Sequence, residues 1–434
     1  MFVLKVLFFT GFFVIFYSYI GYGCLVWLLL GVRNFFRPSI RASRRALIGG
    51  ESTALPAVTL IIAAYNEADF IVEKIENSLA LEYPAEKLEI IFVTDGSTDE
   101  TPQIAARYDR IRVLHSPERK GKVAAMHRAM GEVRTPIVVF SDANTLLNKE
   151  SIFFIARHYH GARTGGVAGE KKVMPAGDVK TAKGGKAGDA RTIKGAKGGA
   201  AMVAAKGKVA GIGEGLYWKY ESFLKRLDSD LFTVVGAAGE LFSIRTELYE
   251  PPGPDVLLDD FIISLRICAR GYRVQYEPAA FAMETPSSSL KEERKRKIRI
   301  SAGAFQSMVM LKELLNPFQH PLLSFQYISH RVLRWTLCPL FLPIILVLNI
   351  LLFATEKSSL FGLLLIAQLI FYATATAGWL LANRNIKSKL LYVPYYFLFL
   401  NISLYQGYFR YKKGQQSVLW EKAVRERKPA GAAR

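Results

Sequence analysis

The chain has 434 residues, of which 51% are hydrophobic, and it carries a formal net charge of +20. This length accommodates one large soluble domain together with membrane segments. Much of the positive charge lies beside apolar segments and no nucleic-acid-binding module is recognisable, so we expect a membrane surface as partner and no nucleic acid. The cysteines, Cys24, Cys268 and Cys338, form no CxxC pair, which argues against a disulfide framework or a zinc site.

Residues 1–32 are predicted to form an N-terminal transmembrane helix. The run from Phe2 to Val32 contains a single charge, Lys5, and is long enough to cross a bilayer. It is too long for a signal peptide and has no clear small-residue cleavage site. Several arginines follow at once in a basic linker over residues 33–55, which by the positive-inside rule places this end of the helix in the cytoplasm.

Short apolar runs rich in β-branched residues then predict strands, and each run ends in a polar cluster. The runs are Val58–Ala63, Leu88–Thr94 and Ile137–Phe140, and helical patterns separate them. This alternation predicts an α/β domain with a parallel sheet and right-handed crossovers. In such sheets ligands bind at the carboxyl ends of the strands.

Carboxylates and amides gather in the sequence at those strand ends, and basic residues lie nearby. The acidic and amide residues are Asn66, Glu67, Asp95, Asp99, Asp142 and Asn144, and the basic ones are Arg119, Lys120 and Lys122. We expect this combination to suit a nucleotide diphosphate together with a divalent metal ion.

Several motifs in this region resemble those of the family-2 glycosyltransferases. They are Ala64-Tyr65-Asn66-Glu67, Asp95-Gly96-Ser97-Thr98-Asp99, Lys120-Gly121-Lys122 and Ser141-Asp142-Ala143-Asn144. The resemblance covers roughly Val58 to Leu315 and implies an inverting enzyme with the GT-A fold, a Rossmann-like domain with a mostly parallel sheet. We therefore predict a glycosyltransferase domain over residues 56–315.

The resemblance also implies roles for individual residues. It assigns nucleotide binding to Ala64, Asn66, Glu67, Asp95, Lys122 and Asp142, with Asp95 at the nucleoside and Lys122 at the diphosphate. Asp142 and Asn144 form a DxD-like element that would hold a divalent cation, Mg²⁺ or Mn²⁺. An amide is a weaker metal ligand than a carboxylate, so the ion would depend more on Asp142 and on phosphate oxygens.

The second half of the domain begins with a predicted helix over Ser151–Tyr159 and a strand over Gly165–Met174. Residues 175–213 are rich in Lys, Gly and Ala and are interpreted as a solvated insert, the alternative being a segment that holds an anionic acceptor or lipid. A helix is predicted over Glu214–Leu227, and the glycines of Val234–Arg245 would let the backbone approach a ligand closely.

Adjacent carboxylates, Asp259 and Asp260, open the next predicted helix. On the simplest interpretation they cap this helix and interact with its dipole. The resemblance instead makes Asp260 the catalytic base, which takes the proton of the acceptor hydroxyl, with Asp259 in a supporting role where the family usually has glutamate.

The basic stretch Lys291–Ile300 is predicted to be a solvated helix face, with Ser289 and Glu292 at capping-box spacing. Relatives often carry Gln-x-x-Arg-Trp here, and this chain has Arg296, Arg299 and Ile300 at those positions. Arg299 can still support the site by pairing with a diphosphate. The missing tryptophan argues against processive polymerisation, although Trp335, or Tyr217 with Trp218, offers another aromatic platform.

Membrane segments are predicted to return over residues 332–411, after an interfacial connection at 316–331 and before a basic tail at 412–434. Two spans are expected at Val332–Ala354 and Leu360–Ala382. A third run, Leu390–Tyr408, is either a further span or a re-entrant or interfacial segment. Three full spans would place the basic tail outside, against the positive-inside rule.

These features predict a multi-pass protein of a bacterial inner membrane, with a cytoplasmic hexosyltransferase-type domain. It would transfer a sugar from a nucleotide sugar, expected to be a UDP-sugar, to a lipid-linked or glycan hydroxyl acceptor in polysaccharide or glycolipid biosynthesis. One alternative is a processive exopolysaccharide synthase, whose channel would require oligomerisation or partner subunits. Another is a non-enzymatic nucleotide-binding membrane regulator. A transporter is disfavoured because the spans carry almost no charge.

Overall fold

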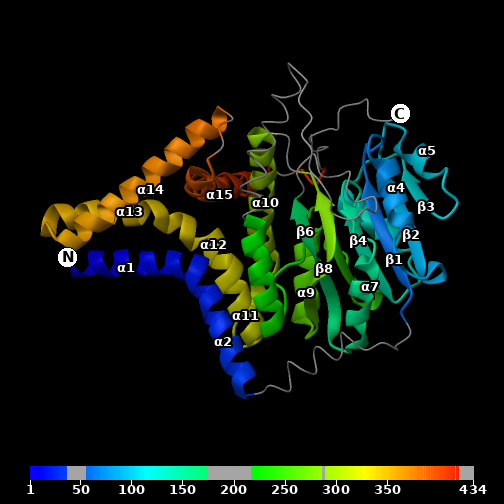
Figure 1. Cartoon of the computed structure of the whole chain (residues 1–434), viewed down its shortest axis with the longest axis horizontal. Helices are drawn as coiled ribbons and strands as arrows, with labels where there is room; N and C mark the ends of the chain where they lie inside the picture. Colours follow the sequence, from blue (N-terminus) through cyan, green and yellow to red (C-terminus); the bar gives the residue numbers. More distant parts are fainter. Residues whose placement is uncertain are drawn as a thin grey trace, which may run out of the picture.

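The computed structural model describes residues 1–36, 55–173, 217–285, 289–384, 386, 388–415 and 417–419. Nearly all of the predicted linker, the whole of the insert at 175–213 and most of the basic tail lie outside these residues. The described chain forms an α/β domain flanked on one side by long apolar helices (Figure 1).

The domain is built on one eight-stranded sheet with the strand order β3-β2-β1-β4-β7-β6-β8-β5. The strands are β1 Val58–Ala64, β2 Leu88–Asp95, β3 Arg112–Ser116, β4 Ile137–Asp142, β5 Leu146–Leu147, β6 Thr164–Val173, β7 Leu241–Arg245 and β8 Arg273–Glu284. The three strands predicted to form a parallel sheet, β2, β1 and β4, are parallel, as expected, and β3, which was not predicted, extends this parallel set beside β2. The strand β6 pairs parallel with β8. Antiparallel β7 joins these two halves, and β5 pairs antiparallel with β8.

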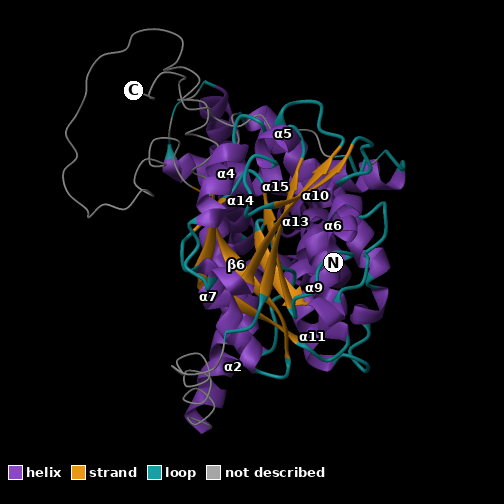
Figure 2. Cartoon of the chain, turned by 90° about the vertical axis from the view of Figure 1, so that its right-hand side faces the viewer, coloured by secondary structure: helices purple, strands orange, loops and turns teal. Residues whose placement is uncertain are grey.

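Helices cover both faces of the sheet, with α4 and α7 on one side and α6 and α9 on the other (Figure 2). The helices of the domain are α4 Ile71–Leu79, α5 Thr101–Ala105, α6 Lys122–Met130, α7 Ser151–Ala156, a helix over residues 217–231, α9 Asp259–Ala269 and α10 Leu290–Met310. Short 3₁₀ turns lie at Ala85–Lys87, Arg157–His160, Thr246–Leu248 and Lys312–Leu315.

Every residue of β1 is buried because both faces of the sheet are covered. Side chains alternate between the two cores: Ile61 packs with α6 and α9, whereas Leu60 and Ile62 pack with α4 and α7. This packing fixes where β1 and β4 end, and therefore where the polar residues that follow them lie.

The N-terminal helical run is longer than predicted and is not straight. It consists of α1 Phe2–Phe16, a π-helical turn Tyr17–Gly21 and α2 Tyr22–Phe36, and it changes direction near the π turn (Figure 1). Only α1 lies along the apolar helix α13. The inner face of α2 instead packs against the helix over 217–231. The predicted span over 1–32 therefore consists of one part beside an apolar helix and one part beside the α/β domain.

The C-terminal region contains α11 Pro321–Tyr327, a π-helical turn Ile328–Val332, α12 Leu333–Trp335, α13 Leu337–Glu356, α14 Ser359–Asn383 and α15 Lys389–Lys412. Among the described residues, Phe2–Phe36, α13 and α14 are long and apolar enough to cross a membrane. The protein is therefore membrane-associated. The first C-terminal span begins at Leu337, later than predicted, because the helix is interrupted at Thr336. The third predicted run forms one helix, α15, which packs along α10 and α14.

Candidate active site

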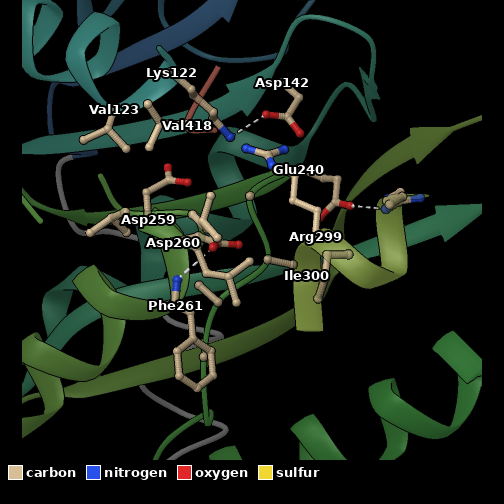
Figure 3. A pocket seen from close by; sticks show the side chains of 18 of the residues that line it. Lys122, Val123, Asp142, Glu240, Asp259, Asp260, Phe261, Arg299, Ile300 and Val418 are labelled. Atoms are coloured by element: carbon tan, nitrogen blue, oxygen red, sulfur yellow. Dashed lines mark hydrogen bonds and ion pairs between the residues drawn. The ribbon is translucent and has the colours of Figure 1, made fainter. Parts of the chain in front are cut away.

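One cavity of about 590 Å³ opens where β1 and β4 end and where α6 and α9 begin. Figure 3 shows the labelled polar side chains around a common space. They are Lys122 from α6, Asp142 from β4, Glu240 from the turn before β7, Asp259 and Asp260 from α9, and Arg299 from α10. The structure thus brings together residues from both halves of the domain, which are far apart in the sequence.

Asp95 is completely buried and does not line the cavity. Its carboxylate accepts hydrogen bonds from the backbone N–H groups of Lys120, at 3.1 Å, and Gly121, at 2.6 Å. Gly121 has φ = +99°, a conformation that favours glycine, and it directly precedes the first residue of α6. Asp95 therefore holds the turn that places Lys122 in the cavity.

Asn66 connects the loops that follow β1 and β2. Its side-chain oxygen accepts a 2.7 Å hydrogen bond from the N–H of Thr98, and its own N–H donates to the hydroxyl of Ser97. Neither Asn66 nor the buried Ala64 lines the cavity, whereas Glu67 does. Tyr65, which was not singled out from the sequence, also lines it, and the Arg119 guanidinium stacks 3.8 Å from its ring centroid.

Lys122 and Asp142 form an ion pair across the centre of the site, with Nζ 2.7 Å from Oδ1 (Figure 3). Burial acts to lower the pKa of Lys122, but the carboxylates of Asp142, Asp259 and Asp260 outweigh it and raise this pKa. Lys122 is therefore a permanent cation, suited to pair with phosphate.

Asp142 and Asn144 both line the cavity beside Lys122. Within the described ranges, no group of three or more His, Cys, Asp or Glu side chains could hold a metal ion by itself. One carboxylate and one amide suit Mg²⁺ or Mn²⁺ only when phosphate and water oxygens complete the coordination. These residues therefore fit a divalent cation that binds together with a nucleotide diphosphate.

Asp259 and Asp260 lie in the first turn of α9, and Oδ1 of Asp260 accepts a 2.8 Å hydrogen bond from the N–H of Phe261. Burial, reinforced by the neighbouring Asp259 carboxylate and opposed by Lys122, raises the pKa of Asp260 to about 7. A carboxyl with this pKa is suited to accept a proton near neutral pH, which simple helix capping would not require.

The glycine-rich turn before β7 brings the backbone close to Asp260. A Cβ atom at Gly239 would lie 3.2 Å from Lys122 Nζ and 3.4 Å from Asp260 Oδ2. Gly236 has φ = +87°, and a Cβ there would lie 2.2 Å from the Phe261 ring. Gly239 therefore leaves the space between Lys122 and Asp260 open to a ligand, and Gly236 allows the turn to pack against Phe261.

The basic start of α10 is solvated on one face only. Lys291, Arg294 and Lys295 are exposed, as predicted. Glu293 and Lys297 are buried, and Arg296 lies 3.6 Å from Glu240 in the cavity wall. This second face was missed because the acidic partner of Arg296 comes from a distant segment. Arg299 extends toward Asp142, and Ile300 lines the cavity (Figure 3). The predicted cap is present, since the Ser289 hydroxyl accepts a hydrogen bond from the N–H of Glu292.

Part of the cavity wall comes from residues that were not predicted as site residues, although three of the aromatic ones were considered as a platform for a sugar. They are Tyr217, Trp218, Glu221 and Lys225 of the helix over 217–231, with Arg331 and Trp335 from the segment that leads to α13. The signal that could have revealed the first group is the spacing of Trp218, Glu221 and Lys225, which places their side chains on one helix face.

Comparisons with known proteins match this chain to glycosyltransferases. A model of glycosyl transferase family 2 matches residues 59–195, and a model of glycosyl transferase family group 2 matches residues 223–382. A poly-β-1,6-N-acetyl-D-glucosamine synthase from Staphylococcus aureus is 22% identical over 303 residues, which cover 67% of this chain and 65% of the synthase. A probable glycosyltransferase, YdaM from Bacillus subtilis, is 25% identical over 276 residues, 61% of this chain and 59% of YdaM. The matches thus span less than two thirds of the length of these relatives.

Among solved structures, a mannosyltransferase from Pyrobaculum calidifontis, PcManGT, in complex with GDP-Man and Mn²⁺, has a TM-score of 0.59. The likeness covers 90% of this chain and 99% of that one, at 19% sequence identity. At this identity the comparison shows the fold alone, and it identifies the sheet and its helices as a GT-A domain.

Proposed function

We propose, from the premise that this chain belongs to glycosyltransferase family 2, that it is a membrane-bound inverting enzyme of the hexosyltransferase type. It transfers a sugar from a nucleotide sugar, with a UDP-sugar as the expected donor, to a hydroxyl group of a membrane-proximal acceptor. The observation that carries the proposal is that Asp260 lines the same cavity as the Lys122–Asp142 pair. Its raised pKa suits it to accept a proton there.

In this mechanism Asp260 takes the proton of the acceptor hydroxyl while the acceptor oxygen attacks the anomeric carbon from the side opposite the leaving diphosphate. One displacement of this kind inverts the configuration at that carbon. Lys122 and Arg299 stabilise the charge that develops on the leaving phosphate. A divalent cation held by Asp142 and Asn144 would supply further charge stabilisation when bound.

The remaining donor-site residues act by positioning. Asp95 holds the Lys120–Gly121 turn, and Asn66 joins the loops after β1 and β2. We propose that these contacts, with Ala64 and Glu67, shape the end of the cavity that receives the nucleoside. The nucleoside would lie at the edge that Asp95 supports, beside the stacked Tyr65 and Arg119.

We further propose that the catalytic domain lies in the cytoplasm of a bacterial cell, because basic residues follow the N-terminal helical run. The acceptor would then be a lipid-linked or other glycan in polysaccharide or glycolipid biosynthesis. The relatives named as poly-β-1,6-N-acetyl-D-glucosamine synthases make UDP-N-acetylglucosamine the first donor to test.

A processive exopolysaccharide synthase is the second candidate, and two observations favour it. Relatives of this kind match the chain, and the aromatic residues Trp218 and Trp335 line the cavity where Ile300 replaces the tryptophan of the family motif. Such a synthase would also need helices from a second copy or from partner subunits to enclose a polysaccharide channel.

A donor screen on the purified full-length protein tests the proposed function. We expect nucleotide diphosphate to be released from one UDP-sugar in the presence of acceptor lipid or glycan. Asp260→Asn should abolish this release while nucleotide binding persists, because an amide cannot accept the hydroxyl proton. Binding without release from any donor, in the wild-type protein, would instead support the non-enzymatic regulator.

A further inference from the structure

The helix over residues 217–231 carries a polar stripe on a face that is turned toward the protein interior. Trp218, Glu221, Lys225 and Asp228 follow one another at spacings of three and four residues, which places them on one side of the helix. Glu221, Lys225 and Asp228 are almost completely buried, whereas Lys219, on another face, is exposed. Polar groups in such positions need partners inside the protein.

The two acidic residues of this stripe have their partners. Glu221 pairs with Arg331 and with Arg334, each at 2.9 Å. Asp228 accepts a hydrogen bond from the hydroxyl of Tyr22 in α2, and its other oxygen lies 2.5 Å from His330 Nδ1. The acids therefore serve to join this helix to α2 and to the segment before α13.

The two hydrogen-bond donors of the stripe are left without partners. Among the described residues, neither the Lys225 ammonium nor the indole N–H of Trp218 has a hydrogen-bond acceptor, although both atoms are shielded from solvent. Lys225 is 2% exposed, and its Nζ lies 5.3 Å from the Trp218 ring. Both residues line the same cavity as Asp260.

We propose that Trp218 and Lys225 form a subsite for the acceptor sugar, in which both side chains donate hydrogen bonds to its carbonyl or hydroxyl oxygens. This inference rests on the proposed function, since it names the acceptor side of the same cavity. An oxygen-bearing ligand supplies the acceptors that the described part of the chain does not offer to these two buried donors.

The surrounding charges point to a neutral sugar rather than an anionic group. Burial lowers the pKa of Lys225, while the carboxylates of Glu170, Glu240 and Glu221 act on it in the opposite direction. Cations are also close: Lys171 and Arg296 pair with Glu240, and Arg331 pairs with Glu221. The cations other than Lys225 are thus already paired with carboxylates, so a neutral N-acetyl or hydroxyl group needs no further counter-charge here.

The test compares Lys225→Met and Trp218→Phe with Lys219→Met, a control on the exposed face of the same helix. Full-length variants are assayed with the donor identified for the wild type and with an N-acetylglucosamine oligosaccharide as the acceptor probe. We expect the acceptor KM to rise about tenfold or more in Lys225→Met, and severalfold in Trp218→Phe, for the loss of one hydrogen bond each. Donor KM, nucleotide binding and acceptor-independent donor hydrolysis should stay unchanged, and Lys219→Met should match the wild type.

Thermal unfolding separates this role from a structural one. Replacing a buried ammonium that lacks a hydrogen-bond partner should leave the Tm of Lys225→Met unchanged or raise it. A lower Tm, or an unchanged acceptor KM in both variants, would overturn the subsite. No nucleotide release by the wild type would instead contradict the proposed function, so the two failures are distinguishable.

Discussion

Asp260→Asn should stabilise the protein at alkaline pH while removing its activity. The pKa of Asp260 is raised from 3.8 to about 7, so the folded protein holds this proton over a pH range in which the unfolded chain has lost it. The contribution of Asp260 to stability therefore falls as the pH rises from about 4 to about 7 and stays constant above that. An asparagine at this position does not titrate and has no such dependence.

The size of the effect follows from the shift in pKa. At about 1.36 kcal/mol for each pH unit, moving the pKa from 3.8 to about 7 corresponds to roughly 4 kcal/mol. Part of the Asp260 side chain reaches solvent in the cavity, which screens the charge, so we expect about 2 kcal/mol. For a domain of this size that amounts to a rise in Tm of several degrees.

The assay is thermal unfolding of wild type and Asp260→Asn in the same detergent at pH 5 and pH 8. At pH 5 the variant should be more stable by only roughly a third of the full difference, and at pH 8 by the whole of it. In parallel, kcat/KM of the wild type should rise with pH and level off above about 7, because the base must be deprotonated. An equal difference in Tm at both pH values would refute the raised pKa and the argument built on it.

Further predictions concern the metal, the glycine turn and the product. Asp142→Ala should weaken donor binding and abolish dependence on divalent ions, because it removes the carboxylate proposed to hold the cation; full wild-type activity in EDTA would exclude this role. Gly236→Ala should destabilise the protein by about 1–3 kcal/mol more than the control Gly271→Ala, since both have φ > 0 but only Gly236 faces the Phe261 ring; equal losses in urea unfolding would count against it. With Ile300 in place of tryptophan, products made with limiting acceptor should be short by mass spectrometry, and long chains formed before the acceptor is consumed would favour the processive synthase.

The strand ends, and the position of the proposed base Asp260 at the start of a helix, were predictable because they depend on short stretches of sequence. The apolar run Ile137–Phe140 identifies β4, which continues two residues further and ends at Asp142, so this carboxylate lies at the carboxyl edge of the sheet. Asp260 was identified by its resemblance to a family motif, and its place at the start of α9 agrees with that prediction.

What could not be predicted depends on partners that are distant in the sequence. The buried side of α10 was not predicted, because nothing nearby in the sequence reveals that Arg296 pairs with Glu240, or that Lys171 pairs with Glu240 and Glu284. The direction of α2 after the bend likewise involves a distant partner, because the Tyr22 hydroxyl donates a hydrogen bond to Asp228 of the helix over 217–231. Hydrophobicity alone could not distinguish these buried charges from surface ones.

The central claim is a single displacement in which Asp260 serves as the base, and the stereochemistry of the product tests it most directly. The anomeric configuration of the newly formed linkage is read by proton NMR on product made by the full-length protein from an α-linked nucleotide sugar. We expect a β-linkage from the wild type and no product from Asp260→Asn. An α-linkage, or transfer by the Asp260→Asn variant at a near-normal rate, would contradict it.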